Sequence, residues 1–484
     1  MHSLDTPAPA HAAARKDGHV PLIVDLDGTL IYTDLLWEAL LVFLRRHLLR
    51  AWLLPLWLFA GKAGFKRRLA DHVELDPAAL PYDTSLLASL SARRAQGVTL
   101  VLATGSERRF AERIAAHLGV FDQVLATDDG VNLTASNKAE RLAALYGERG
   151  FDYIGNAPVD IPVWDRCREP YSVTRRFALS DGRHTQHTGT RRGGWLRPFV
   201  KALRPRQWLK NMLVFVPMLT AHRLDLAAFV PSLLAFAAFS LCASSAYLLN
   251  DALDAQDDRL HPTKRHRPLA AGTLPVPLAL FASPLLAIGA IALAALTGPW
   301  LLAAVAVYFV TTLSYSFTLK RLLMIDIVTL AILYSLRIVG GCAATGIEPS
   351  FWLLGFSFFV FLSLALLKRH SELFNLHRAG KEKTRGRGYT TADKAPVGMM
   401  GVASAFTSVL IFMLYFTSSN VLQLYRHPAL LYPIVPLLVF WLGRLWVLSF
   451  RGEVNEDPVL YVSKDPASLL TVACCAALAA IASL

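Results

Sequence analysis

Short apolar runs, each ending in acidic or glycine residues, alternate with helical stretches in the first 165 residues. The runs are VPLIVDLDGTL (20–30), VTLVLATGS (98–106), QVLAT (123–127) and FDYIGN (151–156). Buried parallel strands read as continuous apolar runs, and strands that alternate with helices form open sheets covered on both faces. We therefore predict a doubly wound α/β domain over residues 20–165, preceded by a disordered tail at 1–19.

Much longer apolar runs fill residues 207–484. Each approaches the roughly 20 residues that a bilayer-spanning helix needs. Nine runs qualify: 208–222, 227–250, 275–297, 300–319, 325–345, 351–372, 397–418, 428–449 and 466–484. The sequence thus predicts an all-α, polytopic membrane domain of about nine transmembrane helices, of which the first is short.

An insertion of unusual length, about residues 31–97, separates the first two predicted strands. It contains LLWEALLVFLRRHLLRAWLLPLWLFAG, within which residues 36–60 admit two interpretations. They form either a helical cap buried on the α/β domain or an amphipathic segment lying on the bilayer. In the second case Trp37, Trp52 and Trp57 would sit at the interface, with Arg45, Arg46 and Arg50 near lipid phosphates.

Charge distribution argues for a membrane partner and against nucleic acid. The net charge is +13, but Lys and Arg gather at the ends of apolar runs, as in KRHR (264–267) and RAGKEKTRGRG (378–388). Loops on the other side, such as TGIEPS, are nearly free of them. The positive-inside rule then places the N-terminal domain in the cytoplasm of a bacterial-type inner membrane and the C-terminus outside. Residues 166–206 are expected to be a basic linker.

Two carboxylates, Asp25 and Asp27, lie two residues apart in DLDGT at the end of the first predicted strand. Gly28 permits the tight backbone that would turn both toward one site. One carboxylate can attack phosphorus while the other handles the proton, and both can help to hold Mg²⁺. A turn of this kind also occurs for purely structural reasons.

Further polar residues at strand ends and helix starts strengthen the case for phosphate chemistry: LATGS offers Thr104, SNKAERL offers Lys138, and GNAPVD offers Asn156 and Asp160. In order and spacing the four motifs resemble those of the haloacid dehalogenase superfamily. The resemblance implies Asp25 as nucleophile, Asp27 as acid/base, Thr104 and Lys138 as phosphate holders, and Asp160 as a metal ligand. Asn156 replaces the family's usual Asp, which would weaken Mg²⁺ binding and leaves a degenerate scaffold as the alternative.

A second acidic cluster, NDALDAQDD, ends the second predicted span. Asn250, Asp251, Asp254 and Asp258 recur at helical intervals of three or four, so we expect them on one face. Carboxylates there are costly unless they coordinate something, and oxygen ligands suit Mg²⁺ bridging a diphosphate. Lys264 and Arg267 follow in KRHRP, which favours an anionic substrate over a merely solvated helix end.

NDxxDxxxD followed by HPxKxxRPxAxG resembles the UbiA superfamily of intramembrane prenyltransferases. RPRQWLKNMLVF, YSFTLKRLLMID, LKRHSEL and RGRGY further resemble its decaprenyl-phosphate phosphoribosyltransferase branch. Aromatic-acceptor members typically show a second DxxxD pair, whereas this chain has Asp326 alone beside Lys320 and Arg321. Arg337 is expected to bind a phosphate or, alternatively, to pair with Asp326. The remaining substrate-binding candidates on this resemblance are Lys210, Tyr315, Lys368 and Arg385.

The resemblance implies Mg²⁺-dependent transfer of 5-phosphoribose from phosphoribosyl diphosphate to a polyprenyl phosphate, with release of diphosphate. The N-terminal domain would then remove the 5-phosphate from the lipid product. The alternative is a UbiA-type enzyme that moves a prenyl group from prenyl diphosphate to an aromatic or lipid acceptor, with the N-terminal domain as a regulatory scaffold.

Overall fold

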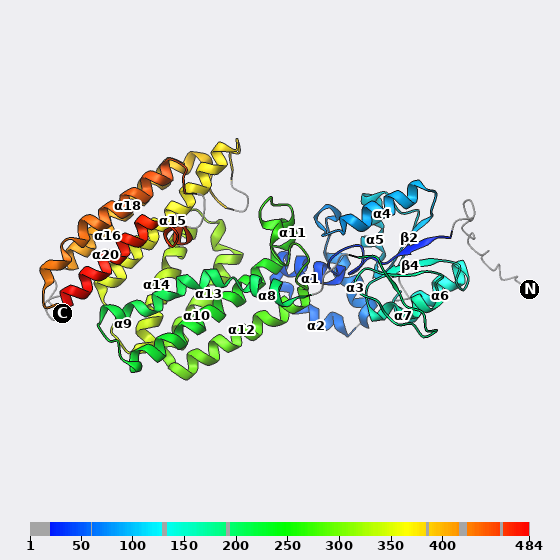
Figure 1. Ribbon diagram of the computed structural model, residues 1–484, viewed down its shortest axis with the longest axis horizontal. Helices are drawn as coiled ribbons and strands as arrows, with labels where there is room; N and C mark the ends of the chain where they lie inside the picture. The colour runs from blue at the N-terminus through cyan, green and yellow to red at the C-terminus, as the bar shows by residue number, and fades with distance from the viewer. Residues whose placement is uncertain are drawn as a thin grey trace, which may run out of the picture. The chain divides into compact units, whose positions relative to one another are not determined.

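The computed structural model describes residues 20–59, 61–127, 133–189, 194–383, 387–415, 424–454 and 458–483. The predicted tail at 1–19 and the candidate Arg385 lie outside these ranges. The chain divides into two compact units (Figure 1), and the first is discontinuous in sequence because it joins residues 1–203 to 248–281. The second unit contains residues 204–247 and 282–484.

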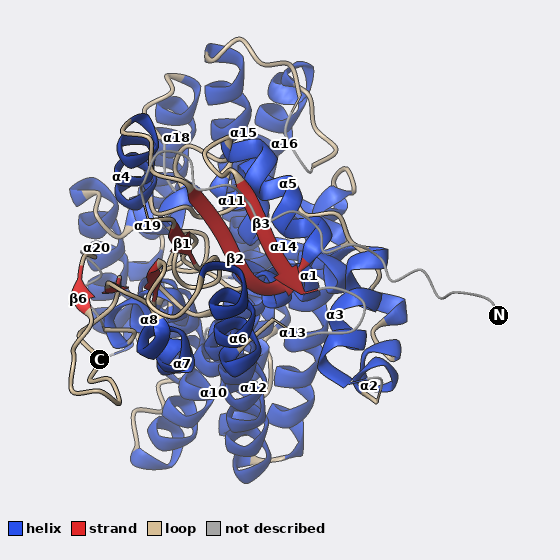
Figure 2. Cartoon of the chain, turned by 90° about the vertical axis from the view of Figure 1, so that its right-hand side faces the viewer, coloured by secondary structure: helices blue, strands red, loops and turns tan. Residues whose placement is uncertain are grey.

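A six-stranded parallel sheet forms the centre of the first unit (Figure 2). Its strands are β1 (Leu22–Val24), β2 (Leu100–Glu107), β3 (Gln123–Thr127), β4 (Asp152–Gly155), β5 (Pro170–Ser172) and β6 (Gln186–His187), in the order β3-β2-β1-β4-β5-β6. β1 is central, and its register pairs Ile23 with Val101 on β2 and with Tyr153 on β4. The doubly wound α/β fold predicted for the N-terminal region is confirmed.

Alternating residues of the central strands feed two separate cores. Leu22 and Val24 pack with residues of α1 (Leu35–Arg46), α3 (Gly61–His72), α4 (Thr84–Ala95) and α5 (Arg108–Leu118). Ile23 packs on the opposite face with residues of α6 (Ala135–Tyr146) and α7 (Ile161–Arg166). Side chains of a strand alternate between faces, so a continuous apolar run is what a sheet covered on both faces requires.

Residues 166–206, expected to be a linker, hold structured elements instead. They contain β5, β6 and α8 (Leu196–Leu203). The sheet therefore continues beyond the predicted end at residue 165. The sequence hides this extension because β5 and β6 are only three and two residues long and lack an apolar run of their own.

The predicted insertion forms a helical cap with α1 and α3 packed on the core, joined by η1 (Leu48–Arg50) and α2 (Leu53–Leu58). Trp57 is buried against Phe43 and His72, so its predicted interfacial position is wrong. Trp37 packs edge-on against Phe281, with ring centroids 6.5 Å apart. The cap interpretation thus holds for α1 and α3, whereas much of η1 and α2 is exposed apolar surface.

Eight helices in the described residues are long and apolar enough to cross a membrane, which makes this a multi-pass membrane protein. They are Leu226–Leu253 (α10), Val276–Thr297 (α12), Pro299–Phe317 (α13), Ile325–Thr345 (α14), Phe351–Arg378 (α15), Thr391–Tyr415 (η7 and α16), Pro428–Phe450 (η8 and α18) and Pro466–Ser483 (α20). Small residues let these helices approach closely. A Cβ at Gly401, for example, would lie 2.0 Å from the Trp446 ring.

The first predicted span, 208–222, is not a single α-helix. Residues Pro205–Phe215 form an extended 3₁₀ helix, η4, and Val216–Thr220 form the short helix α9. Pro217 lies at the start of α9, and a proline has no backbone N–H with which to continue a helical ladder from the preceding turn. Hydrophobicity alone does not register this change of helix type.

Candidate functional site

The DLDGT turn follows β1 and is held by its own backbone. The amides of Thr29, Leu30 and Ile31 all donate to the carbonyl of Leu26, and Gly28 adopts a φ of +72°. A Cβ at position 28 would lie 2.2 Å from Nδ2 of Asn156. Glycine is therefore favoured here by its positive φ, and the side-chain amide of Asn156 lies against the loop that carries Asp25 and Asp27.

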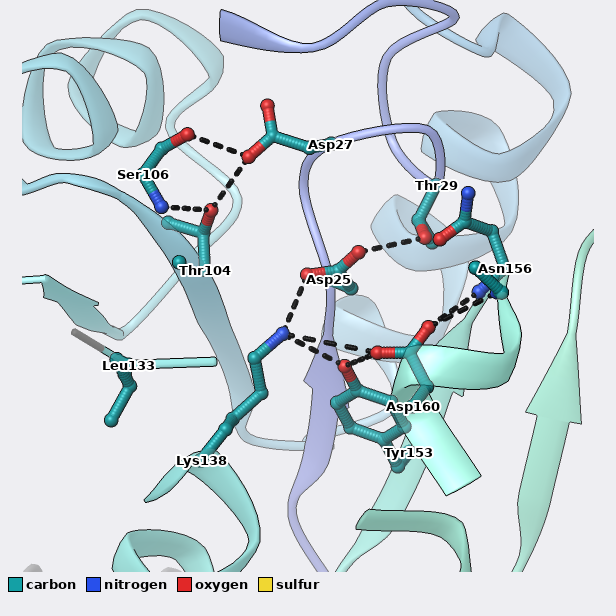
Figure 3. Close-up of polar contacts among 12 residues, drawn as sticks. Asp25, Asp27, Thr29, Thr104, Ser106, Leu133, Lys138, Tyr153, Asn156 and Asp160 are labelled. Atoms are coloured by element: carbon teal, nitrogen blue, oxygen red, sulfur yellow. Dashed lines mark hydrogen bonds and ion pairs between the residues drawn. The ribbon is translucent and has the colours of Figure 1, made fainter. Parts of the chain in front are cut away.

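Asp25 lies at the centre of a buried polar cluster (Figure 3). Its carboxylate accepts hydrogen bonds from Nζ of Lys138 at 2.7 Å and from the Thr29 hydroxyl at 3.1 Å. Burial raises the pKa of Asp25 to about 7, although the charge of Lys138 opposes the rise. A buried carboxylate beside a buried lysine matches the predicted pairing of nucleophile and phosphate holder.

Asp27 is fixed by both carboxylate oxygens. Oδ1 accepts from the amide of Leu35 at 2.8 Å, and Oδ2 accepts from the hydroxyls of Thr104 at 3.1 Å and Ser106 at 2.6 Å. Burial is again the main cause that raises its pKa, to about 6. This carboxyl can exchange a proton near neutral pH, which suits a general acid/base.

The Asp160 carboxylate makes contacts within the protein rather than pointing to an open metal site. Oδ2 of Asp160 accepts from the amides of Asn156 and Ala157 at 3.0 and 3.2 Å, and Oδ1 accepts from the Tyr153 hydroxyl at 2.8 Å. Nζ of Lys138 lies 4.0 Å from the same carboxylate. Asp160 therefore positions the Asn156 turn and Lys138, and its role as a metal ligand stays a prediction.

The oxygen ligands around Asp25 fit a Mg²⁺ ion that keeps several of its water ligands. Within the described ranges, no three His, Cys, Asp or Glu side chains are grouped so that they could hold a metal ion. Mg²⁺ commonly needs only one or two carboxylates together with water and substrate phosphate. Asp25 and the side-chain amide of Asn156, which lies against Gly28, would supply the protein ligands.

The end of α10 and the following α11 (Ala255–Arg259) carry the second acidic set. Nη1 of Arg267 lies 3.0 Å from Asp251 and 2.7 Å from Asp258, so these two carboxylates share one protein cation. Asp254 points elsewhere, toward Nη2 of Arg45 at 3.4 Å. We expected Asn250, Asp251, Asp254 and Asp258 on one face, but Asp254 departs from the Asp251–Asp258 pair because α10 ends at Leu253 and Asp254 is the N-cap residue of α11. Two carboxylates still fit Mg²⁺ that bridges a diphosphate.

The cap helix α1 contacts this acidic end through three ion pairs, of which Arg45 with Asp254 is one. Arg45 donates to the carbonyl of Leu253 and, at 2.6 Å, to Asp257. Glu38, 1% exposed, accepts both Nη atoms of Arg259 at 2.9 and 2.6 Å. Arg259 also donates to the carbonyl of Ala79. Because Asp27 binds the first turn of α1, this single helix connects the two acidic motifs.

Asp326, at the start of α14, is fully buried and neutralised within the second unit. It accepts from Nη2 of Arg369 and from the hydroxyl of Tyr389, both at 2.6 Å. The alternative in which Asp326 pairs with Arg337 is therefore wrong. The true partner lies 43 residues away on α15, a separation that carries no local sequence signal.

Arg337, also buried, is satisfied by neutral groups. Nε donates to Asn211 at 2.7 Å, Nη2 donates to the Tyr308 hydroxyl at 2.8 Å, and Nη1 donates to the carbonyl of Leu333. Its guanidinium also lies over the rings of Tyr308 and Tyr334. These contacts account for a cation inside the second unit. Its assignment to a substrate phosphate stays a prediction.

The other predicted binding residues remain candidates by position. Lys264 is exposed on η5 (Lys264–His266), and Asn250 lies next to Asp251 in the last turn of α10. Nζ of Lys210 lies 5.6 Å from the centroid of the Tyr334 ring. The rest lie in the second unit: Tyr315 in the last turn of α13, Lys320 on η6 (Leu319–Arg321) and Lys368 in the interior of α15.

Several residues that build these sites were not predicted. Ser106 stands in the LATGS motif two residues after Thr104, so alternation along β2 could have indicated it. Tyr153, in contrast, reads as an ordinary strand residue. Arg45, which the interfacial interpretation placed near lipid phosphates, instead pairs with Asp254 and Asp257. Nothing local distinguishes Arg259 or Arg369 from the neighbouring basic residues.

The structure thus combines a multi-pass helical membrane domain with an α/β domain of doubly wound topology. Residues 212–464 match the UbiA prenyltransferase family, and residues 22–164 match the haloacid dehalogenase-like hydrolases. The chain belongs to the UbiA prenyltransferase family and carries an N-terminal haloacid dehalogenase-like domain. Both resemblances expected from the motifs are thus confirmed.

Three similar proteins illustrate these relationships. The uncharacterized protein y4nM of Sinorhizobium fredii is 35% identical over 93% of this chain and 89% of its own length. The decaprenyl-phosphate phosphoribosyltransferase of Mycobacterium tuberculosis is 39% identical over 186 residues, which are 37% of this chain and 62% of that protein. A solved UbiA homolog from Archaeoglobus fulgidus, bound to GPP and Mg²⁺, gives a TM-score of 0.44 at 18% identity, covering 58% of this chain and 99% of its own.

Proposed function

We propose that the membrane domain transfers 5-phosphoribose from phosphoribosyl diphosphate to a polyprenyl phosphate. A phosphate oxygen of the lipid bonds to carbon 1 of ribose while the bond from that carbon to diphosphate breaks. The observation that carries the proposal is Asp326. This carboxylate is neutralised by Arg369 and Tyr389, and Arg369 also pairs with Glu372, so protein cations hold the acidic side chains at the position of the second metal motif of aromatic-acceptor enzymes. The 39% identity to a decaprenyl-phosphate phosphoribosyltransferase supports the same donor and acceptor.

Asp251 and Asp258 would hold Mg²⁺ on the diphosphate, where the ion neutralises the charge of the leaving group. Arg267 already bridges these carboxylates and is the protein cation best placed to contact a diphosphate that arrives there. The buried Asp251 and Asp258 side chains are 3% and 4% exposed, and burial raises the pKa of Asp258. A dry acidic site of this kind gains most from a divalent cation.

The haloacid dehalogenase-like domain would then remove the 5-phosphate from the lipid-linked sugar. Asp25 attacks phosphorus to form an aspartyl phosphate, and Lys138 holds the phosphate oxygens. Asp27 gives its proton to the departing sugar hydroxyl, then takes one from the water that hydrolyses the intermediate. A pKa of about 6 for Asp27 supports both halves of this role near neutral pH.

We also propose that both sites act at the cytoplasmic face of a bacterial inner membrane. Residues 1–203 and 248–281 belong to one compact unit. The chain between them, residues 204–247 with the start of the following segment, must therefore cross the membrane an even number of times. α10 supplies one crossing, and η4 with α9 would supply the other. Eleven 3₁₀ residues and five α-helical residues extend over about 30 Å, close to the thickness of the hydrocarbon core. Nine crossings put the C-terminus outside.

A lipid assay tests the two reactions separately. The purified full-length protein, with Mg²⁺, phosphoribosyl diphosphate and a polyprenyl phosphate, should release diphosphate and form a ribosylated lipid without the 5-phosphate. Mass spectrometry of the lipid reports both steps, because the number of phosphate groups falls only if the second site acts. Absence of diphosphate release would refute the transferase. Incorporation of a labelled prenyl group from prenyl diphosphate would instead support the prenyltransferase alternative.

A further inference from the structure

The segment 48–59 of the cap is apolar on two opposite sides. Its inner side packs on the core of the domain through Leu53, Leu54 and Trp57. Six large apolar side chains of the same segment face outward: Leu48 is 48% exposed, Leu49 93%, Trp52 66%, Leu56 50%, Leu58 63% and Phe59 88%. A helix that is apolar all round is normally buried on all sides. The outer side therefore requires an apolar environment outside the domain.

The cap lies beside the ends of two candidate membrane spans. Trp37 on α1 packs against Phe281 of α12, and Arg45 donates to the carbonyl of Leu253, the last residue of α10. All of these residues belong to the first compact unit. The segment 48–59 follows α1 directly, so it starts close to the level at which α10 and α12 leave the bilayer.

Basic residues accompany the apolar segment. Arg46 precedes it and Arg50 lies within it, and both are exposed, as are Arg67 and Arg68 on α3. Apolar side chains rimmed by arginine are the composition of segments that lie in the interface of an anionic membrane. A protein partner would not require the surrounding charges to be positive only.

We propose that the segment 48–59 inserts into the head-group and upper acyl region of the bilayer, and so anchors the cap of the hydrolase-like domain to lipid. Trp52 and Phe59 would enter the leaflet, while Arg46 and Arg50 contact lipid phosphates. This anchor holds the Asp25 site at the membrane surface, where a lipid-linked phosphate ester would be presented. The anchoring itself does not depend on the proposed function, but its purpose does.

Depth measurement by spin labelling tests the anchor on the full-length protein in nanodiscs that contain anionic lipid. A nitroxide is attached at Leu49→Cys or Phe59→Cys, with Cys474 and Cys475 replaced by serine to prevent labelling there. Glu112→Cys, exposed on α5, is the matched control. We expect oxygen, which concentrates in lipid, to relax the labels at 49 and 59 more than a water-soluble nickel complex does, with the reverse at 112.

Two outcomes would overturn the proposal. Labels at 49 and 59 that respond to the nickel complex as the label at 112 does would place the segment in water. Labels shielded from both reagents would indicate that protein, such as a second copy of the chain, covers it.

A kinetic test examines the purpose of the anchor. Leu49→Asp and Phe59→Asp should lower hydrolysis of the lipid-linked substrate several-fold and leave hydrolysis of a soluble aryl phosphate unchanged. Equal loss on both substrates would indicate damage to the domain and contradict the role in presentation. If neither substrate is hydrolysed even by the unaltered protein, the proposed phosphatase function fails, while the depth measurement still decides the anchor.

Discussion

The two acidic motifs of this protein are held in opposite ways. At DLDGT, Asp25 and Asp27 are fixed by lysine, hydroxyl and amide groups that all belong to one α/β domain. At the end of α10, Asp251 and Asp254 are each paired with an arginine from a different segment, and one of these arginines lies on the cap of that α/β domain. The hydrolase-like site is thus electrostatically self-contained, whereas the geometry of the transferase motif depends on the cap.

The largest effect that would separate the two sites is expected from Asp25→Asn. Loss of the nucleophile should lower phosphatase activity by roughly 10³-fold or more, as removal of nucleophiles does in other enzymes. Diphosphate release should continue, and the 5-phosphorylated lipid should accumulate in the mass spectrum. Asp71→Asn, which alters only an exposed pair with Arg109, is the matched control and should retain hydrolysis. Loss of diphosphate release in Asp25→Asn would contradict the independence of the two sites.

The link between the regions should be sensitive to Glu38→Gln. This change leaves Arg259 buried without a counter-charge, which typically costs about 3–5 kcal/mol. Urea unfolding of the first unit, followed by tryptophan fluorescence, measures the loss. Asp71→Asn breaks the exposed pair with Arg109 and should cost about 1 kcal/mol or less.

A double variant sharpens this result. Glu38→Leu combined with Arg259→Met should recover much of the stability, because apolar residues of similar size often replace a buried ion pair without loss. If Glu38→Gln lowers the free energy of unfolding by no more than Asp71→Asn does, the Glu38–Arg259 pair does not hold the cap to the segment after α10.

A smaller effect, about tenfold on diphosphate release, is expected from Arg45→Gln. The variant loses the donor that holds Asp254 and the carbonyl of Leu253, so the acidic motif is less well ordered for Mg²⁺. A higher Mg²⁺ concentration at half-maximal rate is the expected signature. Arg46→Gln on the same helix should be unchanged. Equal effects of the two variants would show that only the charge of the cap matters.

The smallest effect concerns pH. Burial raises the pKa of Asp25 to about 7 and that of Asp27 to about 6, above the ordinary value of 3.8 in the unfolded chain. The folded state therefore holds protons that the unfolded state has lost, and stability falls as pH rises from about 4 to about 7. Bound Mg²⁺ restores the stability lost at high pH, because it binds the carboxylates only when they are ionised.

Added Mg²⁺ should accordingly raise the thermal midpoint of the first unit by more at pH 8 than at pH 5. The difference should shrink in Asp25→Asn, which carries no ionisable group at that position. An equal rise at both pH values would show that Mg²⁺ does not bind at Asp25.

Local pattern predicted the parts of the structure that local chemistry determines. β1 to β4 were predictable because their apolar runs must be buried on both faces, and Lys138 follows from its place at a helix start. Thr104, predicted at a strand end, lies within β2, which continues to Glu107. β5 and β6 are too short to leave a pattern, and η4 has the hydrophobicity of a span without its helix type. The partners of Asp326 lie 43 and 63 residues away, so that pairing is set by packing alone.

The pairing of Glu38 with Arg259 also imposes an order on folding. Their positions in the chain are 221 residues apart, and α10 lies between them. During synthesis the hydrolase-like domain emerges first, yet the counter-charge that its cap requires arrives only after α10 has entered the membrane. The soluble domain therefore cannot complete its fold ahead of membrane insertion. A fragment that ends near residue 206 should retain its sheet. Its cap should be less stable, because Glu38 would lack its counter-charge and draw water into the cap.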